Sequence, residues 1–382
     1  MQQKRPVTVL VAPLDWGLGH ATRCIPIIHE LIRQGVRVKI AAGSGQKNML
    51  EMEFPQLEFL DIPEFKIRYK KGIFLKWGLI FRIPALLRQI KRENKWLEEI
   101  VRLSAIDAVI SDSRYGLFHK GLFCVFITHQ LNIQSGWVPF SSPRGRSRFA
   151  GAVGGQINRI ILKWNYKYIS KFSSCWVPDL EGSLSVAGIL SHPPVVPPFP
   201  VKYIGILSRF ERPDKKDSKN MLLILISGPE PQRSYFENIL FSQLPGIKME
   251  TVVVRGLPGS GVPVPFIQEG IKIYNHLSTD QLNSLINESA FIIARSGYST
   301  IMDLVHLKKN AILVPTPGQT EQEYLGFYMQ EKKWMYCLSQ KNFNLGKALK
   351  VFQQFELGSP ELPGSLLKEV IEDFIAKISL QN

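Results

Sequence analysis

The chain has 382 residues, of which 45% are hydrophobic and 21% are charged. This composition is that of an ordinary globular protein and excludes disordered, collagen-like and coiled-coil chains, while the length predicts about two domains. Lys and Arg outnumber Asp and Glu by 47 to 32, and the net charge of +15 favours anionic partners such as phosphorylated substrates, nucleic acid or an acidic membrane surface.

The cysteines and the apolar segments indicate a protein of the reducing cytoplasm. The 4 cysteines contain no CxxC pair, so the sequence predicts neither a zinc site nor a disulfide framework. The first apolar run breaks at Asp15 without the small-residue cleavage site of a signal peptide. The segment 77–90 carries Arg82, Pro84 and Arg88 and is shorter than the ~20 apolar residues of a membrane span. We therefore expect a cytoplasmic protein, soluble or peripheral on the inner face of the cytoplasmic membrane.

The first half of the chain alternates predicted strands with predicted helices. Residues 7–13 form a continuous apolar run, which is typical of a parallel strand buried on both faces. Residues 21–34 then carry apolar side chains at helical spacing, and Gly35 follows where a helix C′ residue belongs. Further strands are predicted to begin at 36 and to cover 108–111, 123–128 and 175–178. This alternation indicates a doubly wound parallel sheet.

A linker divides the chain. Residues 191–200 are rich in proline, residues 209–220 are polar, and the strand pattern restarts after them. Later strands are predicted at 221–227, 251–254, 271–274, 291–294 and 311–315, with an amphipathic helix at 365–378. We therefore predict a Rossmann-like domain at 1–208, a linker at 209–220, a second Rossmann-like domain at 221–360, and a helix within 361–382 that packs back toward the first domain.

The loop Asp15-Trp-Gly-Leu-Gly-His20, after the first strand, is the first candidate site. Gly17 and Gly19 let a substrate approach the backbone, and the helix that follows offers free N–H groups and a positive dipole end. In an open α/β sheet this loop lies at the carboxyl edge, where ligands bind, and the imidazole of His20 is suited to taking a proton from a hydroxyl. The alternative is a glycine turn with a capping histidine. The loop lacks the third glycine of the dinucleotide fingerprint.

Asp112 ends a strand predicted to belong to the same sheet. A carboxylate beside His20 would fix the tautomer of the imidazole and stabilise the imidazolium formed after proton uptake. The alternative role for Asp112 is a helix cap or a turn. Asp15 is the second choice of partner for His20.

Two segments of the second half predict a site for phosphates and sugars. Residues 291–303 predict a strand, a Ser- and Gly-rich turn whose N–H groups can hold a diphosphate, and a helix in which Asp303 can accept from ribose hydroxyls. Thr300 and Asp303 also have the spacing of a capping box, which needs no ligand. Residues 311–323 predict a strand and a polar cluster with the donors and acceptors that sugar hydroxyls require. Alone, this segment predicts a helix capped by Thr320.

Together these segments resemble the GT-B nucleotide-sugar glycosyltransferases, especially family 28, which includes the lipid II-forming UDP-N-acetylglucosaminyltransferase. The resemblance is carried by GLGHATRCIPI in the first loop, ARSGYSTIMDL in the second domain and VPTPGQTEQEYLG after it. It implies an α/β protein of two Rossmann-like parallel-sheet lobes with a cleft between them. In that family the acceptor binds the first lobe and the donor nucleotide the second.

The resemblance also assigns roles to residues. It makes His20 the base that deprotonates the acceptor hydroxyl, in the glycine loop of Gly17 and Gly19. Asp303 takes the position of a ribose-binding Glu, and Glu323 stands where the lipid II enzyme has Gln, so the identity of the sugar stays open. The residues matched to the nucleotide-sugar site are Gly228, Tyr274, His276, Leu277, Ser296, Gly297, Ser299, Thr300, Asp303, Glu321, Gln322 and Glu323.

The activity implied is that of an inverting hexosyltransferase that uses a UDP-sugar donor and makes a cell envelope glycan. A hexose or N-acetylhexosamine would pass to a lipid-linked or other glycan acceptor. A helix N-terminus would stabilise the leaving diphosphate in place of a metal ion, so we expect no metal and no cofactor besides the donor substrate. The sequence contains no D-x-D motif.

Two basic stretches with interleaved aromatic residues, 66–102 and 144–171, are suited to an anionic bilayer, where each basic residue contributes about 1 kcal/mol. The alternative is a solvated helix whose aromatic residues pack in the core. No nucleic-acid-binding motif accompanies these stretches, so we expect no nucleic acid partner.

Two other functions remain open. The pattern G-x-G-H-x-x-R-C at 17–24 also looks like the first loop of the UDP-sugar hydrolase of pseudaminic acid synthesis, in which His20 would activate water. The third candidate is a non-catalytic GT-B-like protein that binds an anionic polymer or membrane.

Overall fold

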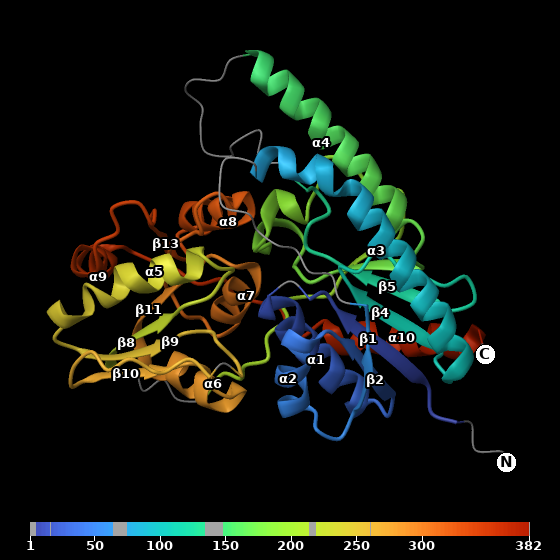
Figure 1. Ribbon diagram of the computed structural model, residues 1–382, viewed down its shortest axis with the longest axis horizontal. Coiled ribbons are helices and arrows are strands. Elements are labelled where there is room, and N and C mark those ends of the chain that lie inside the picture. The colour runs from blue at the N-terminus through green and yellow to red at the C-terminus, as the bar shows by residue number, and fades with distance from the viewer. Residues whose placement is uncertain are drawn as a thin grey trace. The chain divides into compact units, whose positions relative to one another are not determined.

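The computed structural model describes residues 5–15, 17–63, 75–133, 148–213, 219–259 and 261–381. These residues divide into two compact units (Figure 1). The first unit holds the described residues up to 207 together with 363–381, and the second holds the described residues from 208 to 362. The boundary between the units lies at 207 and 208.

The first unit is built on a seven-stranded sheet with the order β3-β2-β1-β4-β5-β6-β7, in which all neighbours are parallel. β1 and β4 are buried along their whole length, which explains their continuous apolar sequences. The strands are β1 (Thr8–Pro13), β2 (Arg37–Ala42), β3 (Glu58–Asp61), β4 (Ala108–Asp112), β5 (Phe123–Ile127), β6 (Ser174–Val177) and β7 (Val201–Tyr203). The helices are α1 (Leu18–Arg33), α2 (Ser44–Glu53), α3 (Leu75–Leu103), α4 (Arg148–Ile169) and α10 (Leu367–Gln381).

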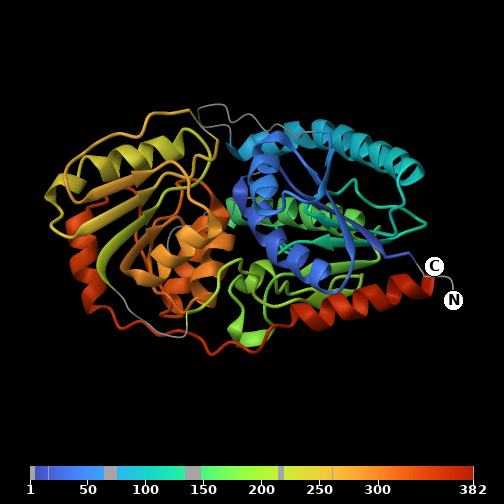
Figure 2. The same ribbon diagram turned by 90° about the horizontal axis from the view of Figure 1, so that it is seen from below.

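The C-terminal helix α10, red in Figure 2, belongs to this first unit. It packs against α1, and its Phe374 makes edge-on ring contacts with Phe123 and Trp176. Lys202 and Asp373 add an ion pair at 2.8 Å. The amphipathic pattern of the last segment thus buries its apolar side against the sheet of the N-terminal unit.

The second unit contains a six-stranded parallel sheet with the order β10-β9-β8-β11-β12-β13. β8 begins at Lys219, so the last two residues of the expected linker pair in the sheet. The strands are β8 (Lys219–Leu225), β9 (Glu250–Val254), β10 (Ile271–Tyr274), β11 (Ser289–Ala294), β12 (Ile312–Leu313) and β13 (Tyr336–Cys337). The helices are α5 (Gln232–Phe241), α6 (Thr279–Glu288), α7 (Tyr298–His306), α8 (Thr320–Glu331) and α9 (Leu345–Gln354).

Both sheets have the doubly wound order of a Rossmann-like domain, with the first strand at the point where the order reverses. The predicted fold class of two Rossmann-like parallel-sheet lobes is therefore confirmed. The elements that were not predicted are β3, β7, β13, α2, α5, α6 and α9. The cleft between the lobes stays a prediction.

The two basic stretches are described only in part, since residues 66–74 and 144–147 lie outside the described residues. In the described part, basic side chains of α3 and α4 are exposed, including Lys91, Arg92 and Lys163. Trp96 packs on the core of the first unit and Tyr166 is buried. This is the arrangement of the alternative interpretation, a solvated helix with aromatic residues turned inward. Within the described residues, no helix is both long and apolar enough to cross a membrane.

Candidate functional site

The glycine loop of the first unit lies at the carboxyl edge of its sheet. β1 ends at Pro13 beside Asp112, the last residue of the neighbouring β4. Helix α1 begins directly after the loop, and its N-cap is Gly17, whose φ of 75° lies in the left-handed region that favours glycine. No side chain caps this helix, so His20 lies in the first turn and does not act as its cap.

The structure brings His20 and Asp112 together, with Nδ1 of the imidazole 3.1 Å from Oδ2 of the carboxylate. Asp112 is fully buried, whereas the side chain of His20 is 18% exposed. Asp112 closes a strand and caps no helix. The pair therefore has the arrangement of a base oriented by a buried carboxylate.

A third residue, Arg23, completes this cluster and was missed from the sequence. Its guanidinium donates from Nε to Oδ2 of Asp112 at 2.7 Å and from Nη2 to Oδ1. Burial alone would raise the pKa of Asp112, but Arg23 and then His20 bring that pKa well below its usual range. Burial and Arg23 lower the pKa of His20, with Asp112 opposing them, so the imidazole is neutral at neutral pH. The signal available in the sequence was the i, i+3 spacing of His20 and Arg23, which places both on one helix face.

Asp15, the second choice of partner for His20, is engaged elsewhere. Its carboxylate accepts from the backbone N–H of Gly43 at 2.9 Å and from the guanidinium of Arg114. Arg114 is 1% exposed and also pairs with the buried Glu93 at 2.8 Å. Burial raises the pKa of Glu93 although Arg114 opposes this. These contacts tie the glycine loop to β4 and α3, so Asp15 shapes the loop.

In the second unit, the two segments predicted to bind phosphates and sugars meet, and Gly228 lies beside them. The hydroxyl of Ser296 donates to the backbone carbonyl of Gln322 at 2.7 Å, and the side-chain oxygen of Gln322 accepts from the N–H of Thr316 at 2.9 Å. Gly228 has a φ of 108°, and a Cβ placed on it would lie 3.7 Å from Oγ1 of Thr316. The glycine turn after β8, the turn after β11 and the segment after β12 therefore form one cluster.

Helix α7 starts at Tyr298 with Gly297 as its N-cap and no side-chain cap. The capping-box alternative is therefore wrong, because Thr300 lies inside the helix. Ser299 and Thr300 are partly exposed in the first turn. Asp303 accepts from the hydroxyl of Ser208 at 2.7 Å, and burial raises its pKa to about 6, against the opposing effect of Arg209.

In the polar segment before α8, Thr320 is not the helix cap that its sequence suggested. Gln319 is the N-cap and no side chain caps the helix, so Thr320 is its first residue. The carboxylate of Glu323 accepts from the N–H of Gly318 at 3.0 Å. Glu321 is partly exposed beside Gln322, whose amide turns toward Thr316.

The end of β10 and the loop after it carry the residues matched to base recognition. Tyr274 is 38% exposed, Leu277 is buried, and burial together with Arg209 lowers the pKa of His276. Arg255 anchors the loop, since its backbone N–H donates to the backbone carbonyl of Tyr274 at 2.8 Å. Backbone groups of this loop are thereby held in place.

Comparison with known families identifies this second unit. Residues 267–358 match the glycosyltransferase family 28 C-terminal domain. The second unit contains a family 28 domain. Along the whole chain, an uncharacterized glycosyltransferase of Methanosarcina acetivorans is 25% identical over 380 residues, covering 94% of this chain and 88% of the relative. The resemblance to family 28 is confirmed, and the chain is a glycosyltransferase.

Solved structures show the same fold. The glycosyltransferase SnogD from Streptomyces nogalater has a TM-score of 0.57 at 14% identity, covering 98% of this chain and 96% of its own. CalG4, the calicheamicin glycosyltransferase, has a TM-score of 0.57 at 12% identity, with 99% and 95% covered. VinC, solved in complex with DTDP, has a TM-score of 0.55 at 11% identity, with 98% and 95% covered. These likenesses show the GT-B fold.

The family 28 domain contains one buried cation that sequence analysis missed. Arg295 is 1% exposed, and burial lowers its pKa to about 10. It donates from Nη1 to the carbonyl of Val314 at 3.1 Å and from Nη2 to that of Gln232 at 3.0 Å, and it lies over the ring of Phe236. In the described part of the chain, its Nε has no hydrogen-bond partner, and neither has Oγ1 of Thr316. The signal available in the sequence was the position of this arginine, directly before the Ser-Gly turn.

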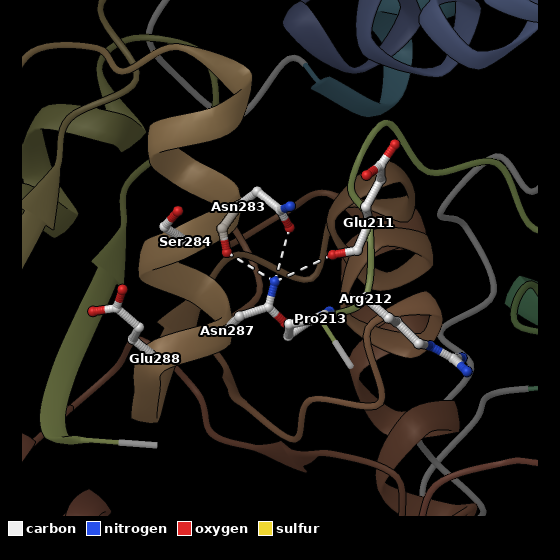
Figure 3. Close-up of a pocket in the computed structure, with 7 residues that line it drawn as sticks. All are labelled: Glu211, Arg212, Pro213, Asn283, Ser284, Asn287 and Glu288. Carbon is white, nitrogen blue, oxygen red and sulfur yellow. Dashed lines mark hydrogen bonds between the residues drawn. The ribbon is translucent and has the colours of Figure 1, made fainter. Parts of the chain in front are cut away.

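A cavity of about 300 Å³ in the second unit lies apart from these motifs (Figure 3). The side-chain nitrogen of Asn287 donates there to Oδ1 of Asn283 at 2.9 Å and to the carbonyl of Glu211 at 3.3 Å. The lining residues are Glu211, Arg212, Pro213, Asn283, Ser284, Asn287 and Glu288. None of the predicted site residues is among them. Over the described ranges, no group of three or more His, Cys, Asp and Glu side chains could hold a metal ion.

Proposed function

We propose that the chain transfers a sugar from a UDP-sugar to a hydroxyl of an acceptor, with inversion at the anomeric carbon and without a metal ion. The observation that carries this proposal is the contact of His20 with the buried Asp112 at the start of α1, beside the glycine loop. A neutral imidazole with one orienting carboxylate has the chemistry of a general base.

In the proposed reaction, the acceptor hydroxyl gives its proton to Nε2 of His20. The acceptor oxygen attacks the anomeric carbon from the face opposite the diphosphate, and the bond from that carbon to the diphosphate oxygen breaks. The electron pair leaves with the diphosphate, so the configuration inverts. Asp112 stabilises the imidazolium that forms, because its own carboxyl stays ionised.

The donor diphosphate is proposed to bind the second unit at the N-terminus of α7 and the turn of Gly228. N–H groups at a helix N-terminus favour anions. The buried, unpartnered Nε of Arg295 and Oγ1 of Thr316 support this position, since both can donate to phosphate oxygens. The complex of VinC with DTDP supports a nucleoside diphosphate as the donor group in this fold.

The other donor contacts follow the family resemblance. Asp303 is proposed to accept from the ribose hydroxyls, and the loop of Tyr274, His276 and Leu277 to contact the uracil. The sugar, a hexose or N-acetylhexosamine, is proposed to bind Glu321, Gln322 and Glu323.

The acceptor is proposed to be a glycan or a lipid-linked sugar of the cell envelope, at the inner face of the cytoplasmic membrane. Exposed basic side chains on α3 and α4 support an anionic surface as a partner, among them Lys91, Arg92 and Lys163. Nucleic acid is not proposed as a partner.

The test is a screen of UDP-sugars for thermal stabilisation, followed by assays of UDP release with and without acceptor. A donor that binds the folded state raises its melting temperature. Release that depends on the acceptor supports the transferase. Rapid release without acceptor favours the nucleotide-sugar hydrolase instead, and the absence of both stabilisation and release favours a non-catalytic protein.

A further inference from the structure

The structure surrounds His20 with more polar groups than the pair with Asp112 requires. Arg23 lies one turn along the same face of α1 and is 3% exposed. Besides holding both carboxylate oxygens of Asp112, its Nη2 lies 2.7 Å from Nδ1 of His20. Its Nη1 lies 3.1 Å from Nδ1 of His129, which is 6% exposed. One cation therefore contacts the carboxylate and two imidazoles.

Two of these partners compete for a single atom. An ionised carboxylate only accepts, so the contact of Asp112 with Nδ1 of His20 requires a proton on Nδ1. A guanidinium only donates, so the contact of Arg23 requires a lone pair on that same nitrogen. A neutral imidazole satisfies one contact at a time. Its Nδ1–H tautomer pairs with Asp112 and leaves Nε2 free to accept a proton, whereas its Nε2–H tautomer pairs with Arg23.

The groups that act on His20 come from three elements. Arg23 lies on α1, Asp112 ends β4, and His129 follows β5. Burial lowers the pKa of His20 most, Arg23 lowers it next and His129 adds a smaller effect, while Asp112 raises it. The Cys24 thiol also lies by Asp112, with Sγ 3.8 Å from Oδ2. Removal of the Arg23 charge is therefore expected to raise the pKa of His20.

We propose that Arg23 is a positioning residue that holds Asp112 and shares Nδ1 of His20 with it, and so sets which ring nitrogen of the neutral imidazole is free to accept a proton. The consequence for the reaction rests on the proposed function, in which His20 is the base. A buried ion pair that only stabilised the fold would hold Asp112 without contacting the imidazole. The contact of Nη2 with Nδ1 is what separates the two roles.

The test is ¹⁵N NMR of the full chain labelled at its 7 histidines, with the His20 signals assigned by their loss in His20→Gln. Imidazole nitrogen shifts report both the tautomer and the midpoint of titration. In the wild type we expect a detectable Nε2–H population. In Arg23→Met we expect the Nδ1–H tautomer to gain population and the midpoint to move to higher pH.

Arg23→Lys keeps the charge but lacks the planar fork that reaches the carboxylate and the imidazole together. We therefore expect the tautomer to shift toward Nδ1–H while the midpoint stays close to that of the wild type. The matched control is Arg33→Met. Arg33 lies on the same helix, but it is exposed and pairs with Glu30 at 2.6 Å. This control is expected to change neither the tautomer nor the midpoint.

Arg23→Met leaves the buried Asp112 without its main counter-charge and is expected to lower stability. Near-UV circular dichroism therefore establishes first that each variant is folded, and Arg23→Lys decides the question if the Met variant is not. An unchanged His20 tautomer in folded Arg23→Lys overturns the proposal.

The NMR result needs no substrate, so it separates this proposal from the proposed function. If the wild type neither binds nor turns over a UDP-sugar, the proposed function fails, whereas the tautomer shift still supports the role of Arg23. If turnover is found, its acid limb is expected to move to higher pH in Arg23→Met, because the base is then protonated at higher pH.

Discussion

The two candidate sites differ in how their buried polar groups are paired. In the first, opposite charges meet: Arg23 pairs with Asp112, and Arg114 pairs with Glu93. In the second, within the residues that the structure describes, Nε of Arg295 and Oγ1 of Thr316 are buried without partners. A buried polar group without a partner costs ~1–3 kcal/mol, which a ligand that pairs with it can recover. The cluster around Asp112 has its charges paired, whereas we propose that the donor diphosphate completes the second cluster.

The largest effect is expected from His20→Ala, which removes the proposed base from the complete cluster. We expect turnover to fall by ~10² or more, the range of a lost general base, while donor affinity is retained. Steady-state kinetics and calorimetry with UDP measure the two quantities. The matched control is His29→Ala, on the same helix, whose side chain is 57% exposed. Equal turnover of His20→Ala and His29→Ala would remove His20 from the chemistry.

The strands of this fold were predictable where burial is complete. β1, β4 and β11 are almost wholly buried, so their apolar runs are continuous. The edge strands β3 and β7 are short and only partly buried, so their sequences carry no such run. These two edge strands and β13 escaped a prediction that depends on unbroken apolar sequence, whereas the edge strand β10 was predicted at 271–274.

The candidate site was predictable where the arrangement of strands in a parallel sheet brings residues together. His20 and Asp112 follow strands that end at one sheet edge, so their proximity needed only the parallel topology. Arg23 and Arg295 were missed because a cation in a sequence is normally solvated, and only packing shows that these two are buried. The caps suggested for Thr300 and Thr320 failed because the N-cap of α7 is Gly297, three residues before Thr300, and the N-cap of α8 is Gln319, directly before Thr320.

The next effect concerns Asp303 of the second unit, the proposed ribose contact. We expect Asp303→Asn to weaken UDP binding about tenfold at pH 8, because a charge-assisted contact with ribose hydroxyls is lost. Below pH 6 the wild-type carboxyl is protonated, so the two affinities should converge there. Calorimetry with UDP at pH 5 and pH 8 measures this, and the titration of UDP itself is common to both proteins. Equal affinities at pH 8 would take Asp303 out of the nucleotide site.

The substitution Asp303→Asn is expected to weaken UDP binding but to raise the stability of the free protein at pH 8. The folded-state pKa of the Asp303 carboxyl, about 6, lies above the ordinary value of 3.8, so the folded chain binds this proton more tightly than the unfolded chain does. The resulting stability is present below pH 4 and is lost as the pH rises through 6. Asp303→Asn should therefore melt at a higher temperature than the wild type at pH 8, with the difference shrinking toward pH 4. A constant difference across this range would contradict the raised pKa.

A smaller effect is expected from Thr316→Val, which replaces a buried hydroxyl without a partner by a methyl group of similar shape. The substitution should raise the melting temperature of the free protein slightly, because an unsatisfied polar atom is removed. It should also weaken UDP binding about fivefold, since one donor to the diphosphate is lost.

Thr251→Val is the matched control for this substitution. Thr251 is also buried, but its hydroxyl donates to the carbonyl of Met249 at 3.0 Å. The control should lower the melting temperature and leave UDP affinity unchanged. If Thr316→Val behaves in the same way as the control, the hydroxyl of Thr316 takes no part in donor binding.

The smallest effect concerns the exposed charges of α3 and α4. Each basic residue near an anionic surface contributes about 1 kcal/mol, so Lys91→Gln or Lys163→Gln should reduce binding to phosphatidylglycerol vesicles by fivefold or less. Co-sedimentation at low and high salt measures this, because salt screens a surface attraction. Lys272→Gln is the control on the second unit, where Lys272 is exposed and pairs with Glu250 at 3.0 Å. Vesicle binding that ignores salt and lipid charge would contradict a role for these basic side chains in membrane attraction.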